Sequence, residues 1–241
     1  MRVLVPRAGR PLGGWEVGKR VRLDEDEVRH LQVRRAKDRE EVVVLDGAGL
    51  LGSGQLVQVG REWMVEISAA EIRQRPSALA LAVAAGDRER FSWMVEKSVE
   101  LGVTRIVPLE TDRAASVATR LKQAHLTRLR RSALEATKQC GVAWEPTIEE
   151  PVALDDFSEQ PLAGAGWLAD QQGAPAPAEL DLRPVTVVIG PEGGLTEAER
   201  GTLLAAGYQP VVLGPHTLRF ETAALAAAAI ISQARMRGQG G

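Results

Sequence analysis

Apolar residues in the first 70 positions come in short runs separated by turn residues. One run, rich in β-branched residues, ends at Leu45 and is closed by Asp46-Gly47, a dipeptide typical of tight turns. Short strands joined by glycine-rich turns favour a small β-barrel or sandwich. The chain then becomes polar and proline-broken, so we expect this domain to end at residue 73. The expected strands cover residues 42–45, 56–59 and 63–67.

Beyond this boundary, apolar runs typical of buried strands alternate with segments of helical periodicity. Such alternation predicts a parallel sheet covered by helices and, on these grounds alone, an ordinary unknotted α/β domain at 74–241. A Pro/Ala/Gln-rich segment near 171–178 is expected to be a loop. The expected strands are 79–85, 105–109, 166–169, 185–189 and 210–213. The expected helices are 91–101, 116–139, 196–206 and 222–235.

The composition argues against several classes of protein. The chain has 241 residues, and no apolar stretch approaches the roughly 20 residues that a membrane-spanning helix needs. Its first residues lack the apolar core of a secretory signal. A single cysteine, Cys140, cannot form an intramolecular disulfide or a cysteine-clustered zinc site. We therefore expect a soluble cytoplasmic protein that binds neither a membrane nor a metal.

Positive charge is concentrated in two places, although the net charge is only −2. Residues 1–39 carry eleven Arg or Lys against six Asp or Glu, and residues 113–138 carry seven against the single Glu135. Such a distribution suits local binding of a phosphate backbone, although charged helices are more often simply solvated. The candidates for nucleic-acid contact are Arg2, Arg7, Arg34, Arg35, Arg128, Arg131 and Lys138.

A glycine-rich turn between a strand and a helix is the first segment with ligand-binding character. Residues 187–196 read Val-Val-Ile-Gly-Pro-Glu-Gly-Gly-Leu-Thr, and open α/β sheets bind ligands at the carboxyl ends of their strands. The turn matches neither the dinucleotide fingerprint nor the phosphate-binding P-loop. Because Glu192 would repel an anion, a cationic or polar neutral ligand fits this turn better than a phosphate.

A second segment of this kind lies before the last expected helix. A strand ends in Gly214-Pro215 and passes through a short loop, and Arg219 and Glu221 lie at or beside the start of the helix. Taken alone, Glu221 is explained about as well as a first-turn carboxylate that complements the helix dipole, with Arg219 as its surface partner. The residues by themselves leave the structural and the functional interpretation open.

Together, the two segments resemble the paired signature of SPOUT methyltransferases and, more narrowly, of the 16S ribosomal RNA (uracil-N3)-methyltransferase family. The signature covers Ile189-Gly190-Pro191-Glu192-Gly193-Gly194 and Leu213-Gly214-Pro215 followed by Leu218-Arg219 and Glu221-Thr222-Ala223. Further matches extend the resemblance over nearly the whole chain, and they lie at 96–103, 106–108, 135–141 and, in the first domain, His30, Leu31, Val33 and Arg35. The paired C-terminal segments are its specific part.

The resemblance implies a PUA-like RNA-binding β-barrel at 1–73 and a methyltransferase domain at 74–241 whose C-terminal part is tied in a trefoil knot. It implies S-adenosylmethionine as the cofactor, held by backbone groups of three loops, and a homodimer. The implied partner is 16S ribosomal RNA or the small ribosomal subunit. By resemblance, the cofactor-binding residues are Leu168, Ala169, Gly190, Pro191, Glu192, Gly193, Gly194, Leu213, Gly214, Leu218 and Arg219.

Methylation at N3 of a uridine requires loss of the N3 proton, because the nitrogen lone pair is available only afterwards. A fixed guanidinium beside O2 or O4 would stabilise the resulting imidate, and holding the reactants in line would lower the barrier further. We assign the first task to Arg219 and expect Glu221 to orient it or to assist proton removal. Two alternatives stay open: another SPOUT reaction, such as ribose 2′-O or guanine methylation, and a non-catalytic RNA-binding relative.

Four positions depart from the usual pattern of this family. Val142 and His216 stand where relatives commonly have Arg, and Arg39 stands where a Gly is usual before a strand. The Lys-Gly that commonly precedes the first helix of the catalytic domain is not found near Asp87-Arg88. These changes affect the expected RNA contacts more than cofactor binding, and they leave room for another target nucleotide.

Overall fold

The computed structural model describes residues 1–5, 15–60, 62–84, 87–114 and 123–238. The chain divides into two compact units, each made of two separate stretches of sequence. Unit 1 comprises Met1–Pro76 and Leu134–Glu145, and unit 2 comprises Ser77–Ala133 and Pro146–Gly241. The expected first domain ends at residue 73 and does not include 134–145, a segment that only contacts in space assign to unit 1.

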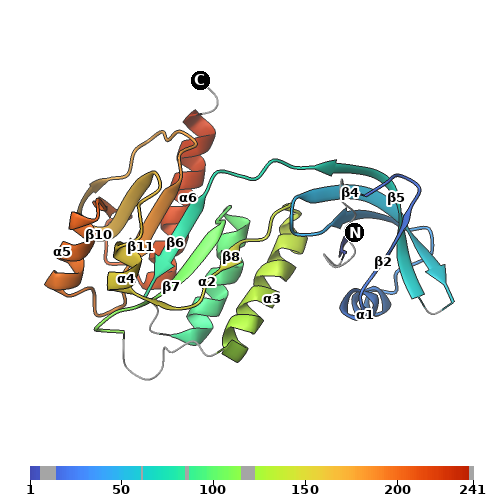
Figure 1. The fold of residues 1–241 in the computed structure, drawn as a ribbon, viewed down its shortest axis with the longest axis horizontal. Coiled ribbons are helices and arrows are strands. Elements are labelled where there is room, and N and C mark those ends of the chain that lie inside the picture. Colours follow the sequence, from blue (N-terminus) through green and yellow to red (C-terminus); the bar gives the residue numbers. More distant parts are fainter. Residues whose placement is uncertain (6–14, 61, 85–86, 115–122, 239–241) are drawn as a thin grey trace. The chain divides into compact units, whose positions relative to one another are not determined.

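Unit 1 contains a five-stranded sheet in the order β1-β3-β4-β5-β2 (Figure 1). Its neighbours pair antiparallel, except that β1 adds to β3 in parallel. The three strands expected from the sequence lie within β3, β4 and β5. The strands are β1 (Arg2–Leu4), β2 (Arg20–Arg22), β3 (Glu41–Leu45), β4 (Leu50–Val59) and β5 (Glu62–Ile72).

The glycines after the first expected strand belong partly to β4 and not only to a turn. Gly52 and Gly54 lie inside this strand, beside an irregularity in its pairing with β5. A Cβ at either position would come within 2.4 Å of a carbonyl oxygen of β5, from Ala69 or Glu66. Glycine is therefore required here by the close approach of the neighbouring backbone.

Unit 1 also contains a helix, α1 (Glu25–Val33), in a region where the pattern predicts only strands. Asp24 caps it by accepting a hydrogen bond from the Glu27 N–H at 2.8 Å. The hydrophobic pattern does not reveal this helix, because only Glu27 and Leu31 are buried on it. Beyond the helix, Arg39 has a φ of 67°, the left-handed conformation that explains why glycine suits this position.

The second stretch of unit 1 is the end of α3 (Gln123–Cys140) and the turn that follows. Trp144 ties this turn to the first stretch, because its indole N–H donates to the Arg73 carbonyl at 3.0 Å. The Arg75 guanidinium lies 5.4 Å from the centre of its ring, which also packs on Gly49. The helix expected at 116–139 is confirmed from Gln123 onward, and its first part lies outside the described residues.

Unit 2 is built around a parallel sheet in the order β12-β10-β11-β6-β7-β8, with β9 also paired to β7 (Figure 1). The pairings among its described strands are parallel. β6 and β11 are buried at every position, as expected for central strands covered on both faces. The predicted parallel α/β sheet is thus confirmed. The strands are β6 (Leu79–Val83), β7 (Arg105–Glu110), β8 (Thr147–Ile148), β9 (Val152–Ala153), β10 (Ala165–Pro175), β11 (Val185–Ile189) and β12 (Gln209–Val212).

Two helices of unit 2, α2 and α5, begin at residues whose side chains cap them. Asp87 caps α2, and Thr196 forms a capping box with Glu199 at the start of α5. In the part of the chain that the structure describes, no helix combines the length and hydropathy needed to cross a membrane. Besides the first part of α3, the helices of this unit are α2 (Arg88–Glu100), α4 (Leu154–Ser158), α5 (Glu197–Ala205) and α6 (Phe220–Gly238).

β10 differs from the expected pattern in a way that shapes the site. The sequence predicts a loop after the first few residues of this strand, but the strand continues to Pro175. Ala169 and Ala174 both pair with Val211 of β12, so residues 170–173 leave the ladder between them. The loop prediction was wrong in its extent, because a short excursion and a return to the same neighbour cannot be distinguished from a loop by composition.

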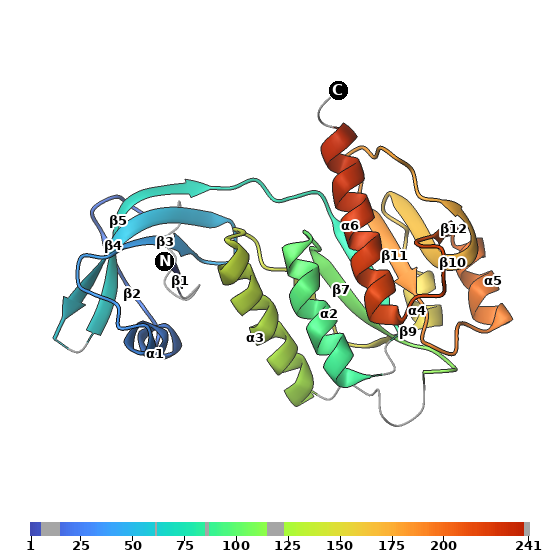
Figure 2. The same ribbon diagram turned by 180° about the vertical axis from the view of Figure 1, so that it is seen from behind.

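α6 packs against α2, β6 and β11 and covers one face of the sheet (Figure 2). The segment between β10 and β11 contacts the last turns of this helix: the Leu180 N–H donates to the Ala234 carbonyl at 3.2 Å. The buried Arg235 guanidinium donates to the carbonyls of Arg183 and Ala78, each at 2.8 Å. These hydrogen bonds compensate the burial of its charge.

Candidate functional site

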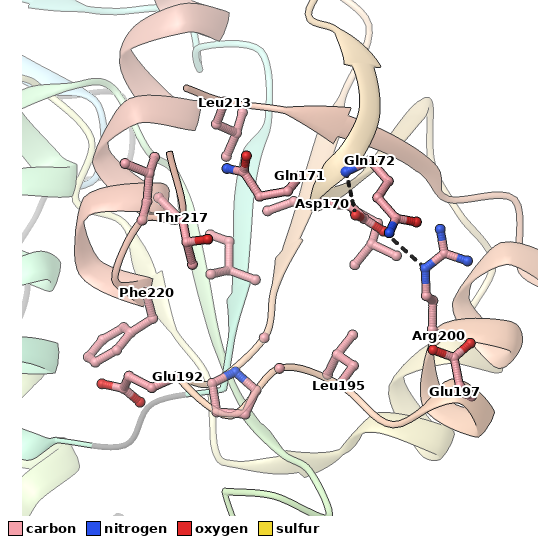
Figure 3. Close-up of a pocket in the computed structure, with 18 residues that line it drawn as sticks. Asp170, Gln171, Gln172, Glu192, Leu195, Glu197, Arg200, Leu213, Thr217 and Phe220 are labelled. Atoms are coloured by element: carbon pink, nitrogen blue, oxygen red, sulfur yellow. Dashed lines mark hydrogen bonds and ion pairs between the residues drawn. The ribbon is translucent and has the colours of Figure 1, made fainter. Parts of the chain in front are cut away.

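A cavity of about 340 Å³ lies where the chain leaves the carboxyl ends of β10, β11 and β12 (Figure 3). Three segments form it: the excursion in β10, the turn between β11 and α5, and the loop between β12 and α6. Ligands of parallel α/β sheets bind at this edge, and the volume falls in the range of small-molecule sites. It is therefore our candidate cofactor site.

The sequence predicted most of the backbone that surrounds this cavity. Three expected cofactor residues, Gly193, Gly214 and Arg219, belong to the same loops but are not among its lining residues. The expected residues that do line the cavity are Leu168, Ala169, Gly190, Pro191, Glu192, Gly194, Leu213 and Leu218.

The polar lining comes largely from residues that the sequence did not single out. Asp170 accepts a hydrogen bond from the Arg200 Nε at 2.9 Å, and the Gln171 side-chain amide donates to the His216 carbonyl at 2.6 Å. Gln172 also lines the cavity, and its N–H donates to the Asp170 carboxylate at 2.8 Å. The hydrogen bond between Arg200 and Asp170 joins the excursion in β10 to α5. The hydrogen bond from Gln171 to His216 joins the excursion to the loop before α6.

Carboxylates stand at both ends of the cavity. Figure 3 shows Glu192 beside Phe220, at the opposite end from Asp170 and Arg200. Glu197 also belongs to the lining, near Arg200 in the same view. With three carboxylates against one guanidinium, the lining favours a ligand that is positively charged or polar and neutral, as the sequence predicts for the glycine-rich turn.

The glycine-rich turn is held from the end of β7. The Arg113 guanidinium donates to the Gly193 carbonyl at 2.7 Å, and the Asp112 N–H donates to the Glu199 carboxylate at 2.8 Å. The other oxygen of Glu199 accepts the Thr196 N–H at 2.7 Å. Glu199 therefore links the start of α5 to a neighbouring loop, and the backbone of the turn is fixed on both sides.

The two expected catalytic residues lie next to the cavity. Arg219 is exposed in the loop before α6, whereas Glu221 is buried within the first turn of that helix. The carboxylate of Glu221 faces Arg90 of α2, whose Nε lies 3.9 Å from its Oε1. Arg90 also lies 3.9 Å from Glu192, so one guanidinium stands between a cavity residue and the start of α6.

The residues expected to contact nucleic acid fall into three groups. Arg128 and Arg131 are exposed and lie three residues apart on α3, which places them on one face of the helix. Arg2, Arg34 and Arg35 are exposed in unit 1. The remaining two differ from these: Arg7 lies outside the described residues, and Lys138 is largely buried.

Lys138 is engaged with carboxylates inside unit 1. Its ammonium lies 2.6 Å from Glu27 and 2.9 Å from Glu135, and its side chain is only 12% exposed. Burial acts to lower the pKa of Lys138, but the hydrogen bonds to both carboxylates outweigh it and raise the value. These contacts favour a structural role over the expected contact with a phosphate.

We expect Lys138→Ala to destabilise the protein by about 3 kcal/mol near neutral pH, because it leaves a buried carboxylate without its partner. Burial already raises the pKa of Glu27, so protonation of this residue favours the folded state. The destabilisation should therefore be largest above the raised pKa of Glu27 and should shrink as the pH falls through it. Urea unfolding at about pH 7.5 and about pH 5 measures both effects.

Lys19→Ala is the control for this comparison, because Lys19 lies in the same unit with its side chain 70% exposed. Its replacement should change the unfolding free energy by no more than about 0.5 kcal/mol at either pH. Equal effects of the two substitutions would contradict a structural role for Lys138.

A cavity of this kind at the carboxyl edge of a parallel sheet is typical of ligand-binding α/β proteins. Comparison with protein families identifies the class of enzyme, because a model described as an RNA methyltransferase domain matches residues 73–232. The chain therefore belongs to the RNA methyltransferase family.

Individual relatives agree with this assignment. Ribosomal RNA small subunit methyltransferase E of a Synechocystis species is 32% identical over 224 residues, which cover 88% of this chain and 72% of that protein. The protein of the same name from Aquifex aeolicus is 29% identical, with 87% and 92% covered. Among solved structures, the enzyme of that name from Neisseria gonorrhoeae, bound to S-adenosyl methionine, aligns with a TM-score of 0.79 at 27% identity, covering 95% of this chain and 94% of the other.

Proposed function

We propose that this chain transfers a methyl group from S-adenosylmethionine to N3 of a uridine in 16S ribosomal RNA. The observation that carries the proposal is the cavity itself, because both signature segments of the resembling family contribute to its wall. The names of the relatives support ribosomal RNA of the small subunit as the substrate, and the Neisseria enzyme, whose structure contains bound S-adenosyl methionine, supports the cofactor. The N3 position follows from the resemblance of the signature.

The residues of the cavity fit this cofactor. S-adenosylmethionine supplies a methyl group that is made electrophilic by a positively charged sulfur. Glu192 provides negative charge at one end of the cavity, and the lining also offers apolar contacts from Leu195 and Leu218. Gly190 and Gly194 also line the cavity, and without side chains they let a ligand approach their backbone closely.

The expected roles of Arg219 and Glu221 are part of the proposal. Arg219 is exposed immediately before α6, so its guanidinium can reach a base that enters beside the cavity. There it stabilises the negative charge that develops on the uracil oxygens when N3 loses its proton. Glu221 lies two residues further on, and its expected role is to orient Arg219 or to assist removal of the N3 proton.

For the RNA, we propose contacts with the exposed arginines and not with Lys138. Arg128 and Arg131 form a short basic face on α3, and Arg34 and Arg35 form a second one at the end of α1. Each of these faces is positioned to neutralise phosphates of the RNA backbone. Contacts with phosphates contribute affinity but do not distinguish one sequence from another. The sheet of unit 1 would then act as the PUA-like RNA-binding barrel of the resembling family.

Two finer features of the fold are also proposed from the resemblance. The first is the trefoil knot of the resembling family. The second is a homodimer, in which the site lies near the subunit interface. Light scattering of the purified protein measures the mass in solution, and a monomer would contradict the dimer.

We expect calorimetry to detect binding of S-adenosylmethionine with a Kd on the order of 1–100 µM, within the usual range for enzyme substrates. Mass spectrometry of digested ribosomal RNA then identifies the product. One uridine should carry an additional methyl group that is missing in a strain without the gene and restored when the gene is returned. Cleavage of the glycosidic bond should leave this methyl group on the base.

The alternative functions predict different results in the same experiments. A methyl group that stays with the ribose indicates 2′-O methylation, and one on guanosine indicates another base reaction. A protein without measurable affinity for S-adenosylmethionine would be a non-catalytic RNA-binding relative. Any of these outcomes contradicts N3 methylation of uridine.

A further inference from the structure

Glu221 is a buried carboxylate whose hydrogen bonding is incomplete. The residue is 7% exposed, and its Oε2 has no hydrogen-bond partner among the described residues. A buried charged group is costly unless it is paired. The amino end of α6 offsets a part of this cost, and the other oxygen, Oε1, faces a cation.

This cation is Arg90, in the first turn of α2. It stands 3.9 Å from Glu221 and 3.9 Å from Glu192, and both distances are too long for hydrogen bonds. Its side chain remains 42% exposed. Two carboxylates thus hold the guanidinium by charge, while its N–H groups can still donate to an oxygen atom of a bound molecule.

Arg90 and Arg219 belong to the same corner of unit 2. α2 packs against α6, and Arg219 directly precedes this helix. Glu192, the second partner of Arg90, lines the cavity beside Phe220 (Figure 3). The guanidinium of Arg90 is therefore anchored at the edge of the proposed cofactor site.

We propose that Arg90 is a second catalytic arginine, which donates hydrogen bonds to one carbonyl oxygen of the target uracil and is positioned by Glu221. This inference rests on the function proposed above. Uracil has carbonyl groups on both sides of N3, so the imidate shares its negative charge between O2 and O4. Arg90 stabilises one of these oxygens and Arg219 the other. Glu221, which was expected to orient Arg219, orients Arg90 instead.

The reaction balances without a further reagent. The N3–H bond of uracil breaks, its electron pair stays on N3, and the proton passes to solvent water. N3 then forms a bond to the methyl carbon, while the bond from that carbon to sulfur breaks and its electron pair stays on sulfur. Arg90 contributes hydrogen bonds and positive charge only.

The first test compares Arg90→Ala with Arg88→Ala, an exposed arginine two residues earlier in the same helix. Arg90→Ala should lower kcat for methylation of a 16S ribosomal RNA fragment roughly 100-fold, because it removes one donor to the developing anion. The KM for the RNA and the calorimetric Kd for S-adenosylmethionine should change by less than about threefold. Arg88→Ala should match the wild type in all three quantities.

Two further variants separate catalysis from a structural ion pair. Arg90→Lys keeps the charge but not the planar fork of donors, so it should recover only a part of the lost rate. Glu221→Gln should also lower kcat. Because Glu221 acts through Arg90, the double variant should be no slower than Arg90→Ala alone.

Several results would overturn the inference. One is an Arg90→Ala enzyme that transfers methyl groups as fast as Arg88→Ala, and another is full recovery with lysine. Loss of S-adenosylmethionine binding in Arg90→Ala would make Arg90 a cofactor residue. If the losses in kcat of Arg90→Ala and Glu221→Gln multiply in the double variant, Glu221 does not act through Arg90. A wild-type protein that neither binds the cofactor nor methylates RNA contradicts the proposed function, which is a separate outcome.

Discussion

Replacement of Arg219 by alanine is expected to lower the rate of methyl transfer roughly 1000-fold, the upper part of the range for losing an electrostatic donor. The guanidinium would no longer stabilise the negative charge that develops on the uracil oxygens when N3 loses its proton. The stability of the fold should not change, because Arg219 contacts the helix through its backbone and its side chain is exposed. Its carbonyl accepts the Ala223 N–H at 2.8 Å, and alanine keeps this hydrogen bond.

The measurement is kcat on a 16S ribosomal RNA fragment, together with calorimetry for S-adenosylmethionine and the urea midpoint of unfolding. Arg237→Ala, an exposed arginine in the last turn of the same helix, is the control and should keep the wild-type rate. Full activity of Arg219→Ala would rule out the catalytic role. A parallel loss of stability would show that the residue supports the helix instead.

Gly164→Ala is expected to lower the free energy of unfolding by about 2–4 kcal/mol, a large effect for one substitution. Gly164 precedes β10 and has a φ of 85°, a conformation that costs alanine about 1–2 kcal/mol. An added Cβ would also lie 2.1 Å from the carbonyl oxygen of Pro184. This carbonyl accepts the Ala165 N–H, so the clash falls on the bond that aligns the start of β10 with β11.

Urea denaturation measures this loss as a lower midpoint with an unchanged slope. Gly201→Ala is a control with the opposite expected sign. Gly201 lies inside α5, where an added Cβ meets nothing within 4 Å, so alanine should stabilise the helix by about 0.5–1 kcal/mol. If both substitutions have similar small effects, the backbone before β10 is less constrained than the structure indicates.

The cavity shows which site residues can be predicted from sequence. Gly190, Glu192 and Leu218 belong to continuous motifs that follow buried strands, and continuous motifs can be recognised along the chain. Arg200 lines the cavity from a helix whose periodicity shows only that it is amphipathic, and Arg90, which faces the lining residue Glu192, belongs to another helix. Their roles depend on which elements pack together, and this information is not contained in the local pattern.

The expectation for Glu221 illustrates the same limit. Arg219 is its neighbour in sequence, so a local reading pairs the two charges. In the fold, the carboxylate is buried against α2 and meets Arg90, more than a hundred residues earlier in the chain. Likewise, Lys138 belongs to a basic stretch of sequence, but its partner Glu27 comes from a helix more than a hundred residues earlier in the chain.

By itself, the sequence determined the parallel α/β sheet, the helices that alternate with its strands and the two glycine-rich loops at its carboxyl edge. Hydrophobic periodicity, capping residues and turn residues are local features, so they can be recognised from the sequence alone. Only the tertiary structure decided that residues 134–145 belong with the first unit, that β10 resumes after its excursion, and that Arg90 faces Glu221. These features arise from contacts between segments far apart in the chain. The free energy of such contacts depends on both segments, so the pattern of either one alone does not predict them.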